Sequence, residues 1–459
     1  MKLDEIHSAY FIGIGGIGMS AIARWFNQRG ATVAGYDRVS TVLTQTLEQE
    51  GISIHYEDDV TAIPDWATDP KGSLIVYTPA IPEDHRGWNF LENMGLNLYK
   101  RSEVLGIISK DHYTLAIAGT HGKTTTSSML AHTLNGSEKG CSAFVGGIMT
   151  NYQSNLIIGD ADAPVVVEAD EFDRSFMRLH PDFTVVTSID PDHLDIYGDP
   201  SEMQDTYMSF IQLTDADGKI ILHEQVANQV QDQLARAFSS YGLESASILA
   251  TNIRVEGNRF VFDYEGGEVI RDIQLKLPGF HNVLNATAAI TAALHVGMSA
   301  IQVKSQIETY EGVKRRFEYI VDQPKFIYID DYAHHPSEIE ALMASVKKLY
   351  PGKKITAVFQ PHLFSRTNDF HKGFAESLSS ADAVLLLDIY PAREQPIKGV
   401  SSEMIHWLVT APKKWMVTKE ELLSVLDGIE TDVLLTIGAG DIDTMVPKIK
   451  SYYEAKLVI

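Results

Sequence analysis

The stretch AIAGTHGKTTTSSML, residues 116–130, has the order of an apolar strand, a glycine-containing turn and the first turns of a helix. Phosphate-binding loops have this order because backbone N–H groups and the helix N-terminus point at the anion, a lysine neutralises terminal phosphate oxygens and a hydroxyl binds Mg²⁺. Gly119, Gly122, Lys123 and Thr124 supply these groups, although the usual loop has a glycine five positions before Gly122, where this chain has Ile117. The stretch predicts a shortened nucleotide-binding loop, with a purely structural turn as the alternative.

A second glycine run, YFIGIGGIGMSAIARWF at residues 10–26, has the same order of strand, turn and helix. Its glycines satisfy the dinucleotide-binding pattern, and Asp37 ends the next expected strand, where it could meet a ribose. Read alone, this run favours a nicotinamide dehydrogenase. The two runs together predict two phosphorylated ligands, unless one of them is only a turn.

The rest of the chain alternates expected strands with helical patterns, which indicates parallel-sheet α/β units. Apolar strand patterns occur at residues 31–37, 73–81, 163–171, 183–193 and 218–223. A length of 459 residues predicts about three domains. We place them at residues 1–108, 109–313 and 314–459, with the basic pair Arg315 and Arg316 as a hinge.

Charge and composition exclude several classes of partner. The chain has 61 acidic and 38 basic residues, and a net charge of -23 opposes a broad nucleic-acid or anionic-membrane surface. The single cysteine, Cys141, excludes an intramolecular disulfide and fits a reducing compartment. No basic leader and no apolar run of roughly 18 residues is evident. We expect a cytoplasmic protein without membrane insertion.

Acidic residues follow two expected strands of the second block. VVVEADEFD contains Glu168, Asp170, Glu171 and Asp173, and SIDPDHLDIYGD follows with further acids and His193. Such acids are often only helix caps or solvated loop charges. Their place at strand ends after a phosphate loop favours a Mg²⁺ site, because this hard cation prefers oxygen ligands.

Seven motifs in order carry a resemblance to a known family: AGTHGKTTT, EADEFDRSF, DPDHLDIYGD, PGFHNVLNATAAI, GVKRRFEYI, DDYAHHPSEI and FQPHLFSRT. Together they strongly resemble the Mur ligases, along essentially the whole chain. The resemblance implies an N-terminal Rossmann-like domain for a UDP-sugar, a central P-loop ATPase-like domain and a C-terminal Rossmann-like domain for an amino acid.

The resemblance also implies a reaction in peptidoglycan synthesis. With GIGGIGMS at the N-terminus, the pattern is similar to members that join L-alanine to UDP-N-acetylmuramate, using ATP and Mg²⁺ to form an acyl phosphate that the amine attacks. The implied ATP-binding residues are Gly119, Thr120, His121, Gly122, Lys123, Thr124, Thr125, His281, Asn282, Arg316 and Asp331. The implied UDP-sugar contacts are Gly13, Gly15, Gly16, Gly18, Met19, Ser20, Asp37, Thr78 and Ala80.

By the same resemblance, Thr124, Glu168 and His193 would hold Mg²⁺, and Lys123, His193 and Arg316 would be catalytic. Asn282 alternatively caps a helix. Because Lys123 is expected in a loop, we expect its replacement by alanine to abolish ligation and to change stability by no more than about 0.5 kcal/mol.

The third block would bring the amino acid. A helical stripe over residues 336–349 predicts a core-facing helix, with Pro336 in its first turn. Tyr332, His334 and Arg366 resemble the family's amino-acid contacts, although either Arg366 or Arg316 could be an ordinary surface ion pair. Leu363 departs from the basic residue that some family members have there.

Three alternatives remain open from the sequence, and the resemblance argues against a fourth, the sibling ligases that add later residues. Sibling ligases use a carbamylated lysine, and the corresponding position here is Tyr207, which cannot carry that modification. A muropeptide-recycling ligase would attach a tripeptide to the same UDP-sugar. A nicotinamide-dependent oxidoreductase would leave the central loop unexplained, and a nucleotide-gated binding protein would need no amino-acid site.

Overall fold

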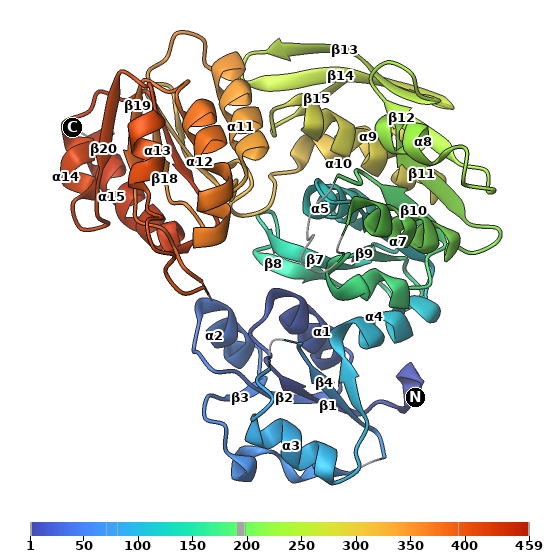
Figure 1. Ribbon diagram of the computed structural model, residues 1–459. Helices are drawn as coiled ribbons and strands as arrows, with labels where there is room; N and C mark the ends of the chain where they lie inside the picture. The colour runs from blue at the N-terminus through green and yellow to red at the C-terminus, as the bar shows by residue number, and fades with distance from the viewer. Residues whose placement is uncertain are drawn as a thin grey trace. The chain divides into compact units, whose positions relative to one another are not determined.

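The computed structural model describes residues 2–69, 71–79, 81–190, 197, 199–392 and 394–457 (Figure 1). It contains three sheets of five, ten and six strands in chain order. By compactness the chain divides into one unit of residues 1–252, 262–273 and 284–310 and a second of residues 253–261, 274–283 and 311–459. The expected α/β fold with successive nucleotide-binding-like sheets is confirmed.

The N-terminal sheet is parallel and has the strand order β3-β2-β1-β4-β5. Its strands are β1 (Ser8–Ile12), β2 (Thr32–Tyr36), β3 (Ser53–His55), β4 (Ser73–Tyr77) and β5 (Leu98–Lys100). Its helices are α1 (Ile17–Gln28), α2 (Val42–Gln49), α3 (Arg86–Asn93) and α4 (Arg101–Lys110). The strand order reverses between β1 and β4, and ligands of open α/β sheets bind at the carboxyl ends of strands at such a point.

The central sheet has the order β15-β14-β13-β12-β11-β10-β6-β9-β7-β8. Its strands are β6 (Thr114–Ala118), β7 (Ser142–Met149), β8 (Ser154–Ile157), β9 (Val165–Glu168), β10 (Phe183–Val186), β11 (Lys219–His223), β12 (Ser239–Gly242), β13 (Ile248–Glu256), β14 (Arg259–Gly266) and β15 (Glu268–Leu275). The accompanying helices are α5 (Lys123–Asn135), α7 (Pro200–Gln212), α8 (Glu224–Val230), α9 (Phe280–His295) and α10 (Ala300–Thr309), with the short helix η4 (Phe172–Arg178).

Strand β6 decides where the central site lies. It runs parallel to β9 on one side and to β10 on the other, with Ile117 opposite Glu168 and Ala118 opposite Val186. The carboxyl ends of these three strands therefore meet at one edge of the sheet. The phosphate loop follows β6 there and the acidic segment with Glu171 follows β9; the second acidic segment lies mostly outside the described residues.

The C-terminal sheet has the order β16-β17-β21-β18-β19-β20. Its strands are β16 (Glu318–Gln323), β17 (Phe326–Asp331), β18 (Ile355–Phe359), β19 (Ala383–Leu386), β20 (Lys413–Met416) and β21 (Val433–Ile437). Its helices are α11 (Pro336–Leu349), α12 (Phe364–Leu378), α13 (Glu403–Leu408), α14 (Leu422–Asp427) and α15 (Val446–Leu457). The expected stripe on α11 is confirmed as core, because Ile339, Leu342, Met343, Val346 and Leu349 are all buried.

Antiparallel segments are the part of the fold that the strand patterns did not indicate. β7 pairs with β8 and β16 pairs with β17 in antiparallel registers, each with an irregularity.

Within the described part of the chain, no helix is long and apolar enough to cross a membrane.

Candidate active site

The turn after β6 requires its two predicted glycines. Gly119 and Gly122 have φ angles of +136° and +84°, a left-handed region that side chains rarely tolerate. A Cβ at Gly119 would also lie 2.1 Å from Thr187 Oγ1, and one at Gly122 would lie 2.8 Å from Asn285 Oδ1. Helix α5 begins directly after Gly122, so its N-terminus opens onto the turn.

The residues after β10 hold the other side of this turn. The Thr120 N–H donates to the Ser188 carbonyl at 3.2 Å, and the His121 N–H donates to Ser188 Oγ at 2.8 Å. Thr187 Oγ1 donates to the Ala118 carbonyl at 3.1 Å. The loop is thus fixed by neighbouring strand ends before any ligand is considered.

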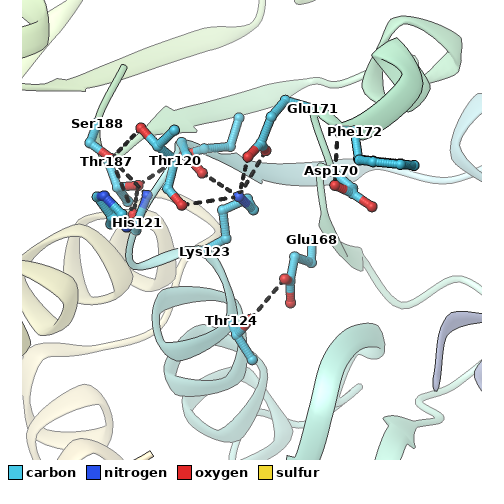
Figure 2. A network of polar contacts seen from close by, with 12 residues as sticks. Thr120, His121, Lys123, Thr124, Glu168, Asp170, Glu171, Phe172, Thr187 and Ser188 are labelled. Carbon is cyan, nitrogen blue, oxygen red and sulfur yellow. Dashed lines mark hydrogen bonds and ion pairs between the residues drawn. The ribbon is translucent and has the colours of Figure 1, made fainter. Parts of the chain in front are cut away.

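Lys123 turns back over the loop toward Glu171 (Figure 2). Its Nζ lies 2.8 Å from Glu171 Oε1 and donates to the Gly119 carbonyl at 2.5 Å. Burial raises the pKa of Glu171, while the Lys123 charge acts in the opposite direction. Glu171 belongs to the acidic segment noted in the sequence, but it was not selected as a site residue there.

Thr124 and Glu168, two of the three predicted metal ligands, lie together. Thr124 Oγ1 donates to Glu168 Oε1 at 2.8 Å (Figure 2). The Gly146 N–H donates to Glu168 Oε2 at 2.7 Å. A hydroxyl and a carboxylate are oxygen donors of the kind that Mg²⁺ prefers. The third predicted ligand, His193, lies outside the described residues.

The remaining predicted ATP contacts differ in their surroundings. Thr125 is half-buried in the first turn of α5. His281 is exposed, whereas Asn282 is buried and its Nδ2 donates to the Pro278 carbonyl at 2.7 Å. Asn282 is the third residue of α9 and its amide donates to a carbonyl just before the helix, so it is not the N-cap that the alternative expected.

The N-terminal glycine turn is close to two of its predicted partners. A Cβ on Gly13 would lie 2.5 Å from Thr78 Cγ2, and the Gly15 N–H donates to Asp37 Oδ2 at 2.7 Å. Asp37 thus closes the turn, and its contact with a ribose stays a prediction. Met19 and Ser20 are buried, and the Ser20 N–H donates to the Gly16 carbonyl at 2.8 Å, so their contact with a ligand stays a prediction. Ala80 lies outside the described residues.

The C-terminal candidates cluster after β17. The rings of Tyr332 and His334 are 5.3 Å apart, and the Arg316 guanidinium lies 5.4 Å from the Tyr332 ring centre. Asp331 accepts backbone N–H groups of Ala333 at 2.8 Å and Phe317 at 2.7 Å. Burial raises the pKa of Asp331 to about 6.

Arg366 lies close enough to His334 and His362 for its charge to affect both. Burial is the main cause that lowers the pKa of His334, and burial with the His334 and Arg366 charges lowers the pKa of His362 to about 4. His362 was missed, although it belongs to the motif from which Arg366 was selected. Leu363 has a φ of +69° and immediately precedes α12, a strained conformation between His362 and Arg366.

Tyr207 packs into the central core. Its ring meets that of Phe176 edge to face at 5.3 Å, and burial together with the nearby Glu171 charge raises its pKa well above the usual value. The position that corresponds to the modified lysine of sibling ligases is therefore a buried phenol beside the partner of Lys123.

Three family models and a near full-length relative match this chain. Family models match residues 8–113 (Mur ligase family, catalytic domain), 117–293 (Mur ligase middle domain) and 315–440 (Mur ligase, glutamate ligase domain). A UDP-N-acetylmuramate–L-alanine ligase of Cytophaga hutchinsonii is 47% identical over 461 aligned residues, covering 99% of each chain.

Two solved structures have the same fold. The UDP-N-acetylmuramate–alanine ligase of Thermotoga maritima matches with a TM-score of 0.83 and 28% identity, covering 98% of this chain and 99% of that one. A murein peptide ligase of Psychrobacter arcticus matches with a TM-score of 0.68 and 21% identity, covering 97% and 98%. Since the family models span most of the sequence and the Cytophaga relative aligns along nearly all of it, the chain belongs to the Mur ligase family.

Proposed function

We propose that the protein joins L-alanine to the lactyl carboxylate of UDP-N-acetylmuramate in an ATP-dependent step of peptidoglycan synthesis. The observation that carries this proposal is the phosphate loop with Lys123 beside the Thr124–Glu168 pair. The near full-length similarity to an L-alanine-adding ligase supports the choice of substrates.

The proposed reaction uses two phosphate-containing substrates, ATP and the UDP-sugar, which accounts for two phosphate-type loops in one chain. A carboxylate is a poor electrophile, so transfer of the γ-phosphoryl group of ATP to it, with ADP leaving, gives an acyl phosphate. The amine of L-alanine attacks the carbonyl carbon, phosphate leaves and the new amide nitrogen loses a proton. Positioning and charge neutralisation account for most of such a transfer. Lys123 and Arg316 are the cations that we assign to the phosphoryl oxygens.

Mg²⁺ fits the Thr124–Glu168 pair. Both side chains offer oxygen donors at the edge of the sheet where the phosphate loop begins. The bound ion would supply neutralisation of phosphate charge. His193 stays the proposed further ligand, on the family resemblance alone.

The other two substrates are assigned to the outer sheets. The N-terminal glycine turn, with Thr78 beside Gly13, would receive the diphosphate of the UDP-sugar at the strand-order reversal. Tyr332, His334 and Arg366 would bind alanine, with the arginine facing its carboxylate. The neutral state that burial favours in His334 leaves Arg366 as the cation for that carboxylate.

A substrate matrix tests the proposal. Phosphate release is measured with ATP, UDP-N-acetylmuramate and one of L-alanine, glycine, L-serine or the L-alanyl-γ-D-glutamyl-diaminopimelate tripeptide. Release that needs both the UDP-sugar and L-alanine is the expected result. Faster release with the tripeptide would select the recycling ligase. Reduction of a nicotinamide, with no phosphate release in any mixture, would select the oxidoreductase.

A further inference from the structure

Arg101 lies against the glycine turn of the N-terminal sheet. It is the first residue of α4, and its side chain occupies the space beside Gly18 in the first turn of α1. A Cβ on Gly18 would lie 2.6 Å from Arg101 Nη1 and 2.9 Å from Arg101 Cδ. A side chain at position 18 would therefore displace the end of the Arg101 side chain.

The same guanidinium reaches the central sheet. Arg101 Nη2 lies 3.3 Å from Asp170 Oδ2, and Asp170 Oδ1 accepts the Phe172 N–H at 3.1 Å. Arg101, Glu168 and Asp170 line one small hollow. Glu168 is the last residue of β9 and Asp170 follows it (Figure 2). Asp170 has no role in the proposed metal or phosphate contacts.

The electrostatics of this position favour an anion. The N-terminus of a helix carries partial positive charge, so a cation held at the first turn of α1 is unfavourable unless negative charge is nearby. Asp170 supplies part of that negative charge. The Asp170 side chain is 39% exposed and the Arg101 side chain is 25% exposed. An arginine has five N–H donors in a planar fork, so Arg101 can keep Asp170 and still bind a second anion.

The first turn of α1 is itself held in place. Asn155, from β8, donates through Nδ2 to Ser20 Oγ at 3.0 Å and to the Ile17 carbonyl. The buried Arg24 donates to Asn155 Oδ1 at 2.6 Å. The first turn of α1 is therefore fixed to β8, and Arg101 lies beside Gly18 in that turn.

We propose that Arg101 binds the diphosphate of the UDP-sugar and that Asp170 positions its guanidinium; this inference rests on the proposed function. Arg101 contributes charge-assisted hydrogen bonds at the turn, where the glycines contribute backbone N–H groups. Asp170 is a positioning residue, because it acts through Arg101.

The test compares UDP with uridine, which lacks the diphosphate. Calorimetric titration of both is combined with the KM values for UDP-N-acetylmuramate and ATP. Arg101→Ala is expected to reduce UDP affinity, and to raise the KM for UDP-N-acetylmuramate, by about tenfold to a hundredfold. Uridine affinity and the KM for ATP are expected to stay within about threefold. Arg101→Lys should recover part of the loss, since it keeps the charge without the fork.

Lys100→Ala is the matched control. Lys100 is the neighbouring cation, and its Nζ pairs with Asp173 Oδ2 at 3.3 Å between the same two segments, with both side chains well exposed. This variant should bind UDP as the parent does. Gly18→Ala should reduce the preference for UDP, because its Cβ displaces Arg101 without removing the charge.

Asp170→Asn separates positioning from general support of the fold. It should lower UDP affinity severalfold in the parent and cause no further loss in the Arg101→Ala background. An equal loss in both backgrounds would overturn the positioning role. An unchanged UDP-to-uridine ratio in both Arg101→Ala and Gly18→Ala would overturn the inference. A parent protein that releases no phosphate with UDP-N-acetylmuramate and L-alanine would instead overturn the proposed function.

Discussion

Lys123 Nζ lies 2.7 Å from Glu171 Oε2, and this ion pair joins the phosphate loop to the segment that follows β9. The two side chains are 14% and 1% exposed. Removing one member of a buried ion pair leaves the charge of the other uncompensated, which is strongly destabilising. Lys123 therefore has a structural role in addition to its proposed contact with phosphate.

Lys123→Ala should abolish ligation and also lower stability. The expectation that stability stays nearly unchanged assumed a solvated loop, whereas Lys123 begins α5 and faces the buried Glu171. We expect a cost on the order of 3 kcal/mol in urea unfolding. Adding Glu171→Gln should recover most of that stability without recovering phosphate release. If Lys123→Ala alone were as stable as the parent, the ion pair would contribute nothing to the stability of the fold.

Glu168→Ala should weaken activation by Mg²⁺, because the Thr124 hydroxyl would lose its carboxylate partner at the strand end. We expect the Mg²⁺ concentration for half-maximal phosphate release to rise about tenfold or more, as for the loss of one charged contact. Asp173→Ala is the matched control, since Asp173 is an exposed carboxylate on the same segment. Identical Mg²⁺ titrations for Glu168→Ala and the parent would place the metal elsewhere.

Local signals account for the parts that the sequence predicted well. The phosphate loop and the helix α11 each combine a strand end or turn with a helical pattern inside one short stretch. Which carboxylate of EADEFD faces Lys123 is not a local property, because it depends on how β9 lies beside β6. Sequence reasoning therefore selected Glu168 but not Glu171.

Long-range contacts explain the other misses. Gly18 was assigned to the dinucleotide pattern, whereas the structure shows that its missing side chain makes room for Arg101, far along the chain. Arg101 lies in no motif that the sequence analysis used. His362 was overlooked because a histidine beside a proline carries no pattern of its own, and only folding brings it near His334 at 6.2 Å between ring centres.

Asp330 should make stability depend on pH in mildly acidic solution. Burial raises its pKa to about 6 from an ordinary value of 3.8, although Thr436 donates to it and Arg315 Nε lies 3.3 Å away. The native state thus holds the proton more tightly than the unfolded state, so this contribution is full below pH 3.8 and is lost as pH rises through about 6.

The measurement compares urea unfolding of the parent and Asp330→Asn between about pH 4 and pH 7. A pKa shift of this size corresponds to roughly 3 kcal/mol of unfolding free energy. As pH rises, the parent should therefore lose about that much stability relative to Asp330→Asn. Above about pH 6.5 the difference should be constant. A difference that does not change across the range would contradict the raised pKa.

Amino-acid choice should favour L-alanine over its smaller and larger relatives. Glycine lacks one methyl group, whose burial contributes about 1 kcal/mol, so its kcat/KM should be roughly fivefold lower. L-serine should react slowly, since a hydroxyl is only a modest change in a small pocket. Competition between labelled amino acids in one mixture measures these ratios directly. Equal use of all three would mean that the pocket does not select on the side chain.

Arg366→Ala should raise the KM for L-alanine and leave the KM for ATP nearly unchanged. The lowered pKa values of His334 and His362 leave both rings neutral near pH 7. Arg366 is therefore the charged member of this group of three side chains, and its removal would take the positive charge away from the alanine carboxylate. Loss of a charge-assisted hydrogen bond corresponds to about a tenfold increase or more. Arg366→Lys should recover part of it, because lysine keeps the charge without the planar fork. The KM values for ATP and UDP-N-acetylmuramate are measured in the same preparations as internal controls. Equal increases for alanine and ATP would instead assign Arg366 to the arrangement of the active enzyme as a whole.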